Sequence, residues 1–278
     1  MFPPKRILFP VDFSDRCTDA ARMVETFAGH FQSALTFLHV LEPLTYNDLP
    51  MDTGEMVEEQ LHTYLGDEFK QFEVERVLLR GDPAQQIIEC AHSGHFDLIM
   101  LPTHGYGRFR RFILGSVTAK VLHDAKCPVW TGVHMEQVPR LEDIAFRHLA
   151  CAVDLGDQSC RALRWATQFA FEFGAAMTVV HAIPASSDSA ELYAGYDAPR
   201  ELIARARDRI ESLQNSIGCE ADVTVVAGEV PQVVHSAVER VGADLLVIGR
   251  SVENGVLGRL RTNAYSIIRQ SPCPVISV

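Results

Sequence analysis

The chain has 278 residues, of which 47% are hydrophobic and 22% charged, an ordinary globular composition that excludes a disordered or fibrous protein. Its length predicts about two domains of ~140 residues, each large enough to bury its own core. The formal net charge of -11 comes from interspersed acidic and basic residues, which argues against nucleic acid as the main partner.

No targeting or membrane segment is predicted from this sequence. Its N-terminus lacks the apolar run of a signal peptide, and no stretch approaches the roughly 18 apolar residues of a membrane span. Seven cysteines form no CxxC pair, and their odd number suits a reducing compartment. We therefore expect a cytoplasmic protein without a membrane partner. Cys90, His92 and His95 lie close in sequence, but a metal site needs a fourth ligand, so none is predicted.

Two halves of the chain carry the same landmarks in the same order. Residues 7–12 (Ile-Leu-Phe-Pro-Val-Asp) match residues 149–154 (Leu-Ala-Cys-Ala-Val-Asp). The order predicts a duplicated domain, with limits at 1–135 and 147–278 and a polar join at 134–147. Further matches pair 35–40 with 177–182, 81–83 with 228–231, 96–101 with 243–248, and 127–129 with 273–275.

Short Val-, Ile- and Leu-rich runs alternate with helical periods in each half, which is typical of βαβ units on a buried parallel sheet. The fold class is therefore α/β, with two tandem Rossmann-like domains, each a five-stranded parallel sheet covered by helices on both faces. The first helix should begin near Ser14-Asp15, and a later one at Asp82 before Pro83. The predicted apolar face of the first helix is Ala20, Ala21, Val24, Phe27, Ala28 and Phe31. The corresponding helix of the second half repeats it with Ala162, Leu163, Ala166, Phe169, Ala170 and Phe173.

Two segments are too long and polar for simple turns, residues 42–54 and 184–198. We expect flexible loops there, with a lid over the sheet edge as a further hypothesis.

A ligand crevice in an open α/β sheet lies where the strand order reverses, which selects the loops after the first and fourth strands. In the first half these are residues 10–14 and 102–116. The second loop has glycines for close backbone approach, a Gly115-Ser116 helix start that attracts phosphate, and three nearby arginines. An equally weighted alternative is that the glycines only serve a turn, Ser116 is an ordinary cap and the arginines are solvated.

Two common phosphate motifs are excluded. No GxxxxGK[ST] occurs, and Gly105-Tyr106-Gly107 follows the fourth strand rather than the first. A P-loop NTPase or a standard dinucleotide oxidoreductase is therefore not predicted.

The second loop resembles that of the universal stress protein family, whose nucleotide-binding members carry glycine, two residues, glycine, nine residues, glycine and Ser or Thr. Gly105, nine residues, then Gly115-Ser116 match, while Pro102 stands at the first glycine. The resemblance, tandem type, covers both halves, including the Cys-Pro-Val entry to each last strand. It implies a cofactor-binding set of Pro10, Asp12, Val40, Pro102, His104, Gly105, Gly115, Ser116 and Val117.

The resemblance also implies roles. Asp12 would contact the adenosine part, Val40 would meet adenine through its backbone, and Gly105 with residues 115–117 would cradle phosphate beside His104. For His104, capping a turn is favoured over acting as a catalytic base, and no catalytic residue is predicted.

The second half departs from the motif. It keeps Asp154 and Gly249, but Val252 replaces the second glycine, and the Cys-Pro-Val alignment puts Arg261-Thr262 opposite Gly115-Ser116 with one residue fewer in the loop. The Arg261 side chain would occupy the phosphate space, although its charge could bind a smaller anion. We therefore expect a degenerate phosphate loop in this domain, and a site that is weaker, altered or empty.

The leading hypothesis is a stress-response protein that binds an adenine nucleotide, ATP with or without Mg²⁺, in the first domain. One alternative is slow ATP hydrolysis, with Asp12 helping to hold a divalent ion and Arg108 or Arg110 stabilising phosphate charge. Another is a nucleotide-independent scaffold, in which the copies pair as an intramolecular pseudo-dimer through their last strands, as the family resemblance implies. A homodimer of such tandems is also open.

Overall fold

The structure is a computed structural model, and it describes residues 2–42, 53–103, 114–132, 144–184, 198–250 and 259–278. The chain divides into two compact units, unit 1 (Met1–Ile144) and unit 2 (Ala145–Val278).

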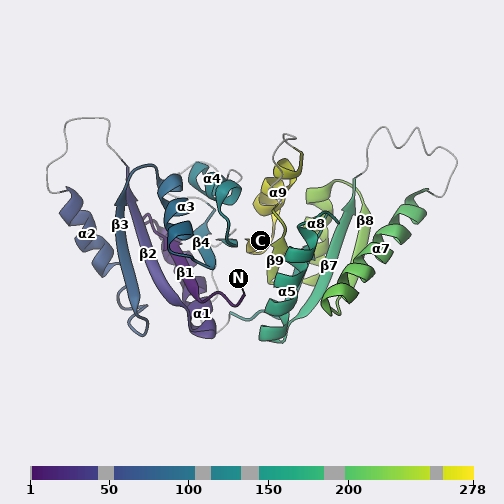
Figure 1. The fold of residues 1–278 in the computed structure, drawn as a ribbon, viewed down its shortest axis with the longest axis horizontal. Coiled ribbons are helices and arrows are strands. Elements are labelled where there is room, and N and C mark those ends of the chain that lie inside the picture. Colours follow the sequence, from purple (N-terminus) through teal and green to yellow (C-terminus); the bar gives the residue numbers. More distant parts are fainter. Residues whose placement is uncertain (1, 43–52, 104–113, 133–143, 185–197, 251–258) are drawn as a thin grey trace. The chain divides into compact units, whose positions relative to one another are not determined.

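Unit 1 is a parallel five-stranded sheet between two layers of helices (Figure 1). Its strand order is β3-β2-β1-β4-β5, with the reversal between β1 and β4. Helices α3 and α4 pack together on one face, and α1 and α2 cover the other. The elements are β1 (Arg6–Pro10), α1 (Asp15–Phe31), β2 (Ala34–Leu41), α2 (Thr53–Thr63), β3 (Val74–Arg80), α3 (Pro83–Ser93), β4 (Leu98–Pro102), α4 (Ser116–Asp124) and β5 (Val129–Gly132).

Unit 2 repeats this arrangement with strand order β8-β7-β6-β9-β10, all neighbours parallel. Helix α5 packs against α7 on one face, and α8 against α9 on the other. The predicted fold class is therefore confirmed in both units. The elements are β6 (His148–Ala152), α5 (Ser159–Phe173), β7 (Ala176–Ile183), α7 (Ala198–Ile217), β8 (Asp222–Ala227), α8 (Val230–Val241), β9 (Leu245–Ile248), α9 (Arg259–Gln270) and β10 (Val275–Ser277).

Local sequence explains where the helices begin. Ser14 is the N-cap of α1, and its hydroxyl accepts a hydrogen bond from the Cys17 amide at 3.3 Å. Asp82 caps α3 in the same way, accepting from the Gln85 amide at 2.7 Å. Both predicted helix starts are confirmed.

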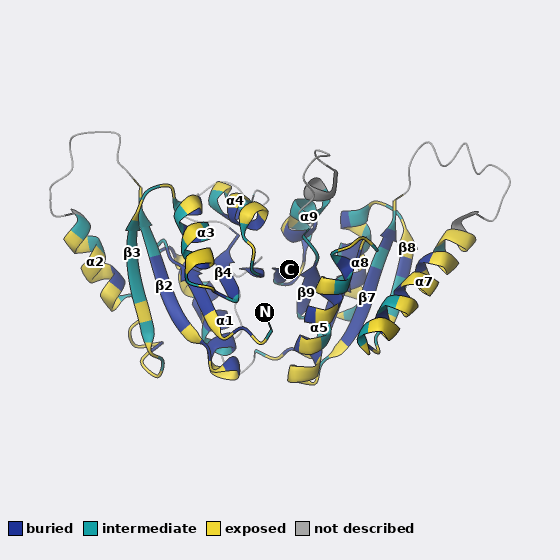
Figure 2. Ribbon diagram, viewed as in Figure 1, coloured by how far each residue is buried: buried dark blue, intermediate teal, exposed yellow. Residues whose placement is uncertain are grey.

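The predicted apolar faces are also buried. Every predicted residue of α1 is buried, and of the six residues predicted in α5 only Phe173 is partly exposed. Figure 2 shows the same pattern, since the central strands of each sheet are buried along most of their length. Burial of both sheet faces is what the continuous apolar runs predict.

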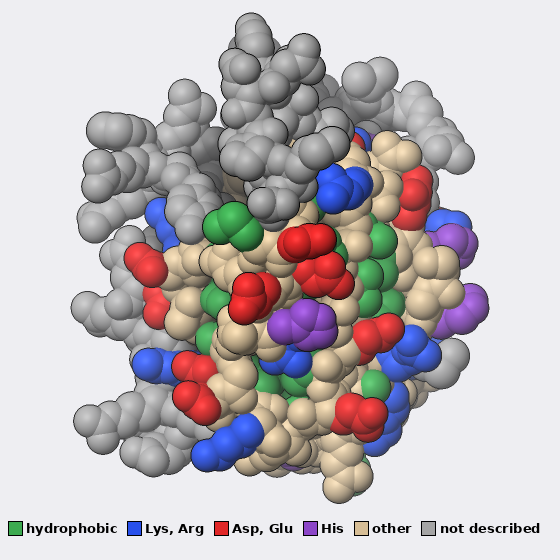
Figure 3. All heavy atoms as spheres, turned by 90° about the vertical axis from the view of Figure 1, so that its left-hand side faces the viewer, with side chains coloured by type: hydrophobic (Ala, Val, Ile, Leu, Met, Phe, Trp, Pro, Cys, Tyr) green, Lys and Arg blue, Asp and Glu red, His purple; other side chains and the backbone are tan. Residues whose placement is uncertain are grey.

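Several predicted features lie outside the described residues. These are most of the predicted loops at 42–54 and 184–198, most of the join at 134–147, and the arginines of the second loop. In the described part of the chain, no helix is long and apolar enough to cross a membrane. Acidic and basic side chains are interspersed on the face of unit 1 that Figure 3 shows.

Candidate functional site

The candidate site of unit 1 lies at the carboxyl ends of its strands, where the strand order reverses. Strand β1 pairs with β2 on one side, with Pro10 opposite Leu38, and with β4 on the other. The Val11 amide donates to the Leu38 carbonyl at 2.8 Å, which continues this pairing toward Asp12. The turn after β1 therefore lies beside the end of β2, where Val40 is found.

Asp12 forms a tight turn that starts α1. One carboxylate oxygen, Oδ1, accepts from the Ser14 amide at 3.0 Å and from the Ser14 hydroxyl at 2.6 Å. The Asp12 side chain is half-buried. Burial and the negative charge of Asp12 raise the pKa of the Cys17 thiol. Since the thiolate is the reactive form, we expect the buried Cys17 thiol to be unreactive.

An aromatic cluster surrounds this turn. Phe13, which has a left-handed backbone at φ 61°, stacks on His39 with ring centroids 4.5 Å apart. Tyr64 packs edge-on against Phe13 at 5.1 Å. His39 Nδ1 lies 2.7 Å from the Val11 carbonyl, which can only accept, so Nδ1 carries a proton and Nε2 accepts in the neutral ring.

Sequence reasoning missed this cluster. The repeat pairs His39 with His181, and both rings bond to the carbonyl before the site aspartate, so this match was a usable signal for the histidines. Nothing in the sequence points to the contact between Phe13 and Tyr64.

The other end of the site is formed where β4 ends. Pro102 is buried and pairs with Gly132 of β5. Its carbonyl accepts from the Thr118 hydroxyl at 3.1 Å, and the Thr103 carbonyl accepts from the Gly115 amide at 2.9 Å. The start of α4 is thereby fixed against the end of β4.

Among the described residues, no side chain caps the start of helix α4. Gly115 is the N-cap residue, and Ser116 is exposed in the first turn, so Ser116 is not the cap that the alternative interpretation requires. The Ala119 amide donates to the Gly115 carbonyl at 2.8 Å, and the amides of residues 116–118 precede this first helical bond. Such amides, together with the helix dipole, favour a bound anion.

Seven of the nine predicted site residues are therefore described, and they lie on β1, β2, β4 and α4, at or just beyond the carboxyl ends of the strands. His104 and Gly105 lie outside the described residues. The assignment of ligand contacts to all nine stays a prediction.

Unit 2 repeats the aspartate turn. Asp154 Oδ1 accepts from the Gly156 amide at 2.9 Å and from the Ser159 hydroxyl at 2.8 Å. His181 Nδ1 lies 2.8 Å from the Val153 carbonyl, as His39 does with Val11. The two units thus share the polar framework around the turn.

A pocket of about 450 Å³ lies at this turn in unit 2, a size typical of small-molecule sites. Its lining is mostly apolar, with Asp154, His181 and Asn263 among the polar groups. The sequence did not predict an open cavity here. It is lined by the ends of β6, β7 and β9 and by α5, α8 and α9.

The phosphate end differs between the units. Thr262 aligns with Ser116, the first residue of α4, but α9 already begins at Arg259. At Thr262 the backbone is therefore inside a helix, where amides bond to carbonyls four residues earlier. The amides that precede the first helical bond of α4 therefore have no counterpart at this position of α9.

The universal stress protein family model matches residues 3–131 and 145–278, which covers both units. The chain belongs to the universal stress protein family. A universal stress protein of Methanocaldococcus jannaschii is 29% identical over 135 residues, covering 45% of this chain and 79% of the relative. One from Thermus aquaticus is 30% identical over 135 residues, covering 45% of this chain and 96% of the relative.

Solved structures extend the family fold to the whole chain. The crystal structure of a universal stress protein from Archaeoglobus fulgidus has a TM-score of 0.72 at 20% identity, covering 98% of this chain and 95% of that one. A functionally unknown protein from Pseudomonas aeruginosa has a TM-score of 0.69 at 17% identity, covering 99% and 92%. At these identities the similarity concerns the fold.

Proposed function

We propose that unit 1 binds an adenine nucleotide, ATP with or without Mg²⁺, and that this binding serves a stress response. The observation that carries the proposal is the start of α4, which no described side chain caps and which is tied to the end of β4 at the same sheet edge as the Asp12 turn. The two-domain limits at 1–135 and 147–278, and a cytoplasmic location, belong to the same proposal.

The two ends of this edge suit the two ends of a nucleotide. Asp12 accepts hydrogen bonds, as a ligand hydroxyl requires, and the amides of residues 116–118 donate them, as phosphate requires. Pro102 replaces a glycine of the family motif, but it is buried in the end of β4 and its carbonyl is satisfied by Thr118. This packing supports the view that proline at this position is compatible with nucleotide binding.

The first test is mass spectrometry of any ligand released from protein purified without added nucleotide. The second is the ATP-dependent shift in melting temperature (Tm) of the full chain. At an ATP concentration of 100 Kd, binding to the native state adds about 2.7 kcal/mol to its stability. Gly115→Arg, which places a long side chain at the start of α4, should abolish the shift.

A matched pair of variants locates the site. Asp12→Ala and Asp154→Ala each remove the acceptor of an equivalent turn, so both should lower the Tm of the unliganded protein. Only Asp12→Ala should also lose the response to ATP. A response lost in Asp154→Ala and kept in Asp12→Ala would place the site in unit 2 and contradict the proposal.

The same samples separate the alternatives. Absence of both a released nucleotide and a shift would favour the nucleotide-independent scaffold, including a pseudo-dimer or a homodimer. ADP formation that is lost in an Asp12→Ala, Gly115→Arg double variant would support slow hydrolysis at the site, whereas ADP formation that persists would indicate a contaminant.

A further inference from the structure

The residue that follows the site aspartate has a left-handed backbone in both units, with φ 61° at Phe13 and φ 62° at Leu155. Neither residue is glycine, so this conformation is unfavourable in isolation and needs support from neighbouring groups. In each unit a side chain from the second helical segment contacts this residue.

In unit 1 the support comes from Tyr64, immediately after α2. Its ring packs edge-on against Phe13, and its hydroxyl lies 3.1 Å from Thr18 Oγ1 in the first turn of α1. Thr18 Oγ1 also lies 3.4 Å from the Ser14 carbonyl, to which it donates, so it accepts the hydrogen bond from Tyr64. Phe13 is thus held between Tyr64 and His39.

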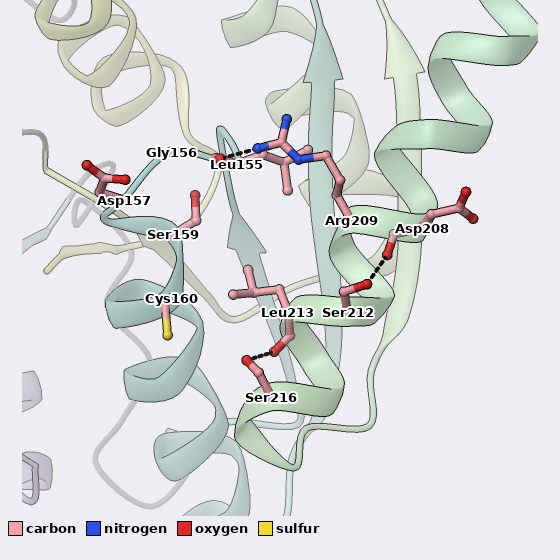
Figure 4. Close-up of a pocket in the computed structure, with 10 residues that line it drawn as sticks. All are labelled: Leu155, Gly156, Asp157, Ser159, Cys160, Asp208, Arg209, Ser212, Leu213 and Ser216. Carbon is pink, nitrogen blue, oxygen red and sulfur yellow. Dashed lines mark hydrogen bonds between the residues drawn. The ribbon is translucent and has the colours of Figure 1, made fainter.

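In unit 2 the support comes from Arg209 of α7. Its Nη2 donates to the Leu155 carbonyl at 2.9 Å, across the top of the groove between α5 and α7 (Figure 4). The groove has a volume of about 520 Å³ and is also lined by Cys160, which aligns with Thr18 of unit 1. Leu155, Gly156 and Ser159 line both this groove and the pocket at Asp154.

Tyr64 and Arg209 occupy equivalent places. In each second helical segment three buried residues recur at intervals of four, and Tyr64 and Arg209 each directly precede the middle one. These buried residues are Leu61, Leu65 and Phe69 in unit 1, and Ala206, Ile210 and Gln214 in unit 2. The residue after the site aspartate is therefore contacted by an aromatic ring in unit 1 and by a guanidinium in unit 2, from equivalent positions.

We propose that Tyr64 and Arg209 are positioning residues, which hold the turn after the site aspartate in the geometry that a ligand requires. The direction of the Asp12 carboxylate depends on this turn, because Oδ1 is bonded to the Ser14 amide. If the turn populates other conformations, the apparent affinity equals the intrinsic affinity multiplied by the fraction of molecules in the competent conformation. For nucleotide binding in unit 1, this inference rests on the proposed function.

The binding test compares ATP Kd values of the full chain by calorimetry, well below the Tm. Tyr64→Ala removes both contacts and should weaken ATP binding about three- to tenfold, the range of a lost hydrogen bond or ring contact. Tyr64→Phe keeps the ring contact and should recover part of the affinity. Phe31→Leu, which alters packing at the far end of α1, should leave the Kd unchanged, as should Arg209→Met in the other unit.

Hydrogen exchange of the unliganded protein tests the positioning separately. Tyr64→Ala should speed exchange in the peptide 11–18 but not in 153–159, and Arg209→Met should do the reverse, with rescue by Arg209→Lys. Unchanged exchange in both variants would overturn the inference, as would an unchanged Kd in Tyr64→Ala. If the wild type binds no ATP, the proposed function fails, and the exchange experiment still decides whether these residues position the turn.

Discussion

Phe169 should be a main contributor to the stability of unit 2. Its ring is fully buried and contacts Trp165, Phe146 and Phe173, with centroid distances of 5.3, 5.0 and 4.5 Å. Replacing a buried Phe by Ala costs about 3–5 kcal/mol, because apolar contacts are lost and a cavity remains. Since each aromatic pair adds about 0.5–1.5 kcal/mol, we expect Phe169→Ala to fall in the upper half of that range.

Phe171 provides the matched control. It lies two residues further along α5 and is 87% exposed, so Phe171→Ala makes the same chemical change with almost no loss of packing. Its effect on the free energy of unfolding should stay within about 0.5 kcal/mol.

The assay is urea unfolding followed by the fluorescence of Trp165, in a Trp130→Phe background so that only unit 2 reports. A loss in Phe169→Ala below about 2 kcal/mol, or an equal loss in Phe171→Ala, would refute the packing argument.

Three further outcomes are expected. Gln32 and Gly174 are equivalent C-caps with φ 50° and 62°, so Gln32→Gly should stabilise the protein and Gly174→Gln destabilise it, each by about 1 kcal/mol in chemical denaturation. The Gln85 amide and Lys120 lower the pKa of Asp82. The contribution of Asp82 to folding stability is therefore fully present above the ordinary carboxyl pKa and is lost as the pH falls through the lowered pKa. In a pH series of melting curves, the difference in Tm between the wild type and Asp82→Ala should disappear in acid. Cys151 is fully buried and burial raises the pKa of its thiol, so mass spectrometry should find it alkylated by iodoacetamide only after unfolding.

The fold could be predicted from the sequence because its signals are local. The apolar period of α1 and the Asp82-Pro83 helix start each lie within a few residues of the structure that they specify. The internal repeat then carried each assignment from one half to the other. The position of the candidate site at the carboxyl ends of the strands likewise follows from the sheet topology alone.

The finer parts of the site depend on contacts between distant residues. Tyr64 reaches Thr18 across 46 positions, and nothing in the local pattern of either residue indicates that contact. The left-handed backbone at Phe13 is similar, since glycine would have signalled it and phenylalanine does not. The early start of α9 was hidden because its equivalent in unit 1 begins three residues later in the alignment.

The groove between α5 and α7 and the pocket at Asp154 have a common wall in Leu155, Gly156 and Ser159. A compound in the groove between α5 and α7 that shifts this wall changes the affinity for a compound at Asp154, and thermodynamic linkage requires the reverse effect to have the same factor. A compound bound in the groove can therefore change the affinity of the pocket at Asp154 without blocking that pocket. Screening of small molecules against unit 2 should accordingly score pairs of compounds as well as single ones.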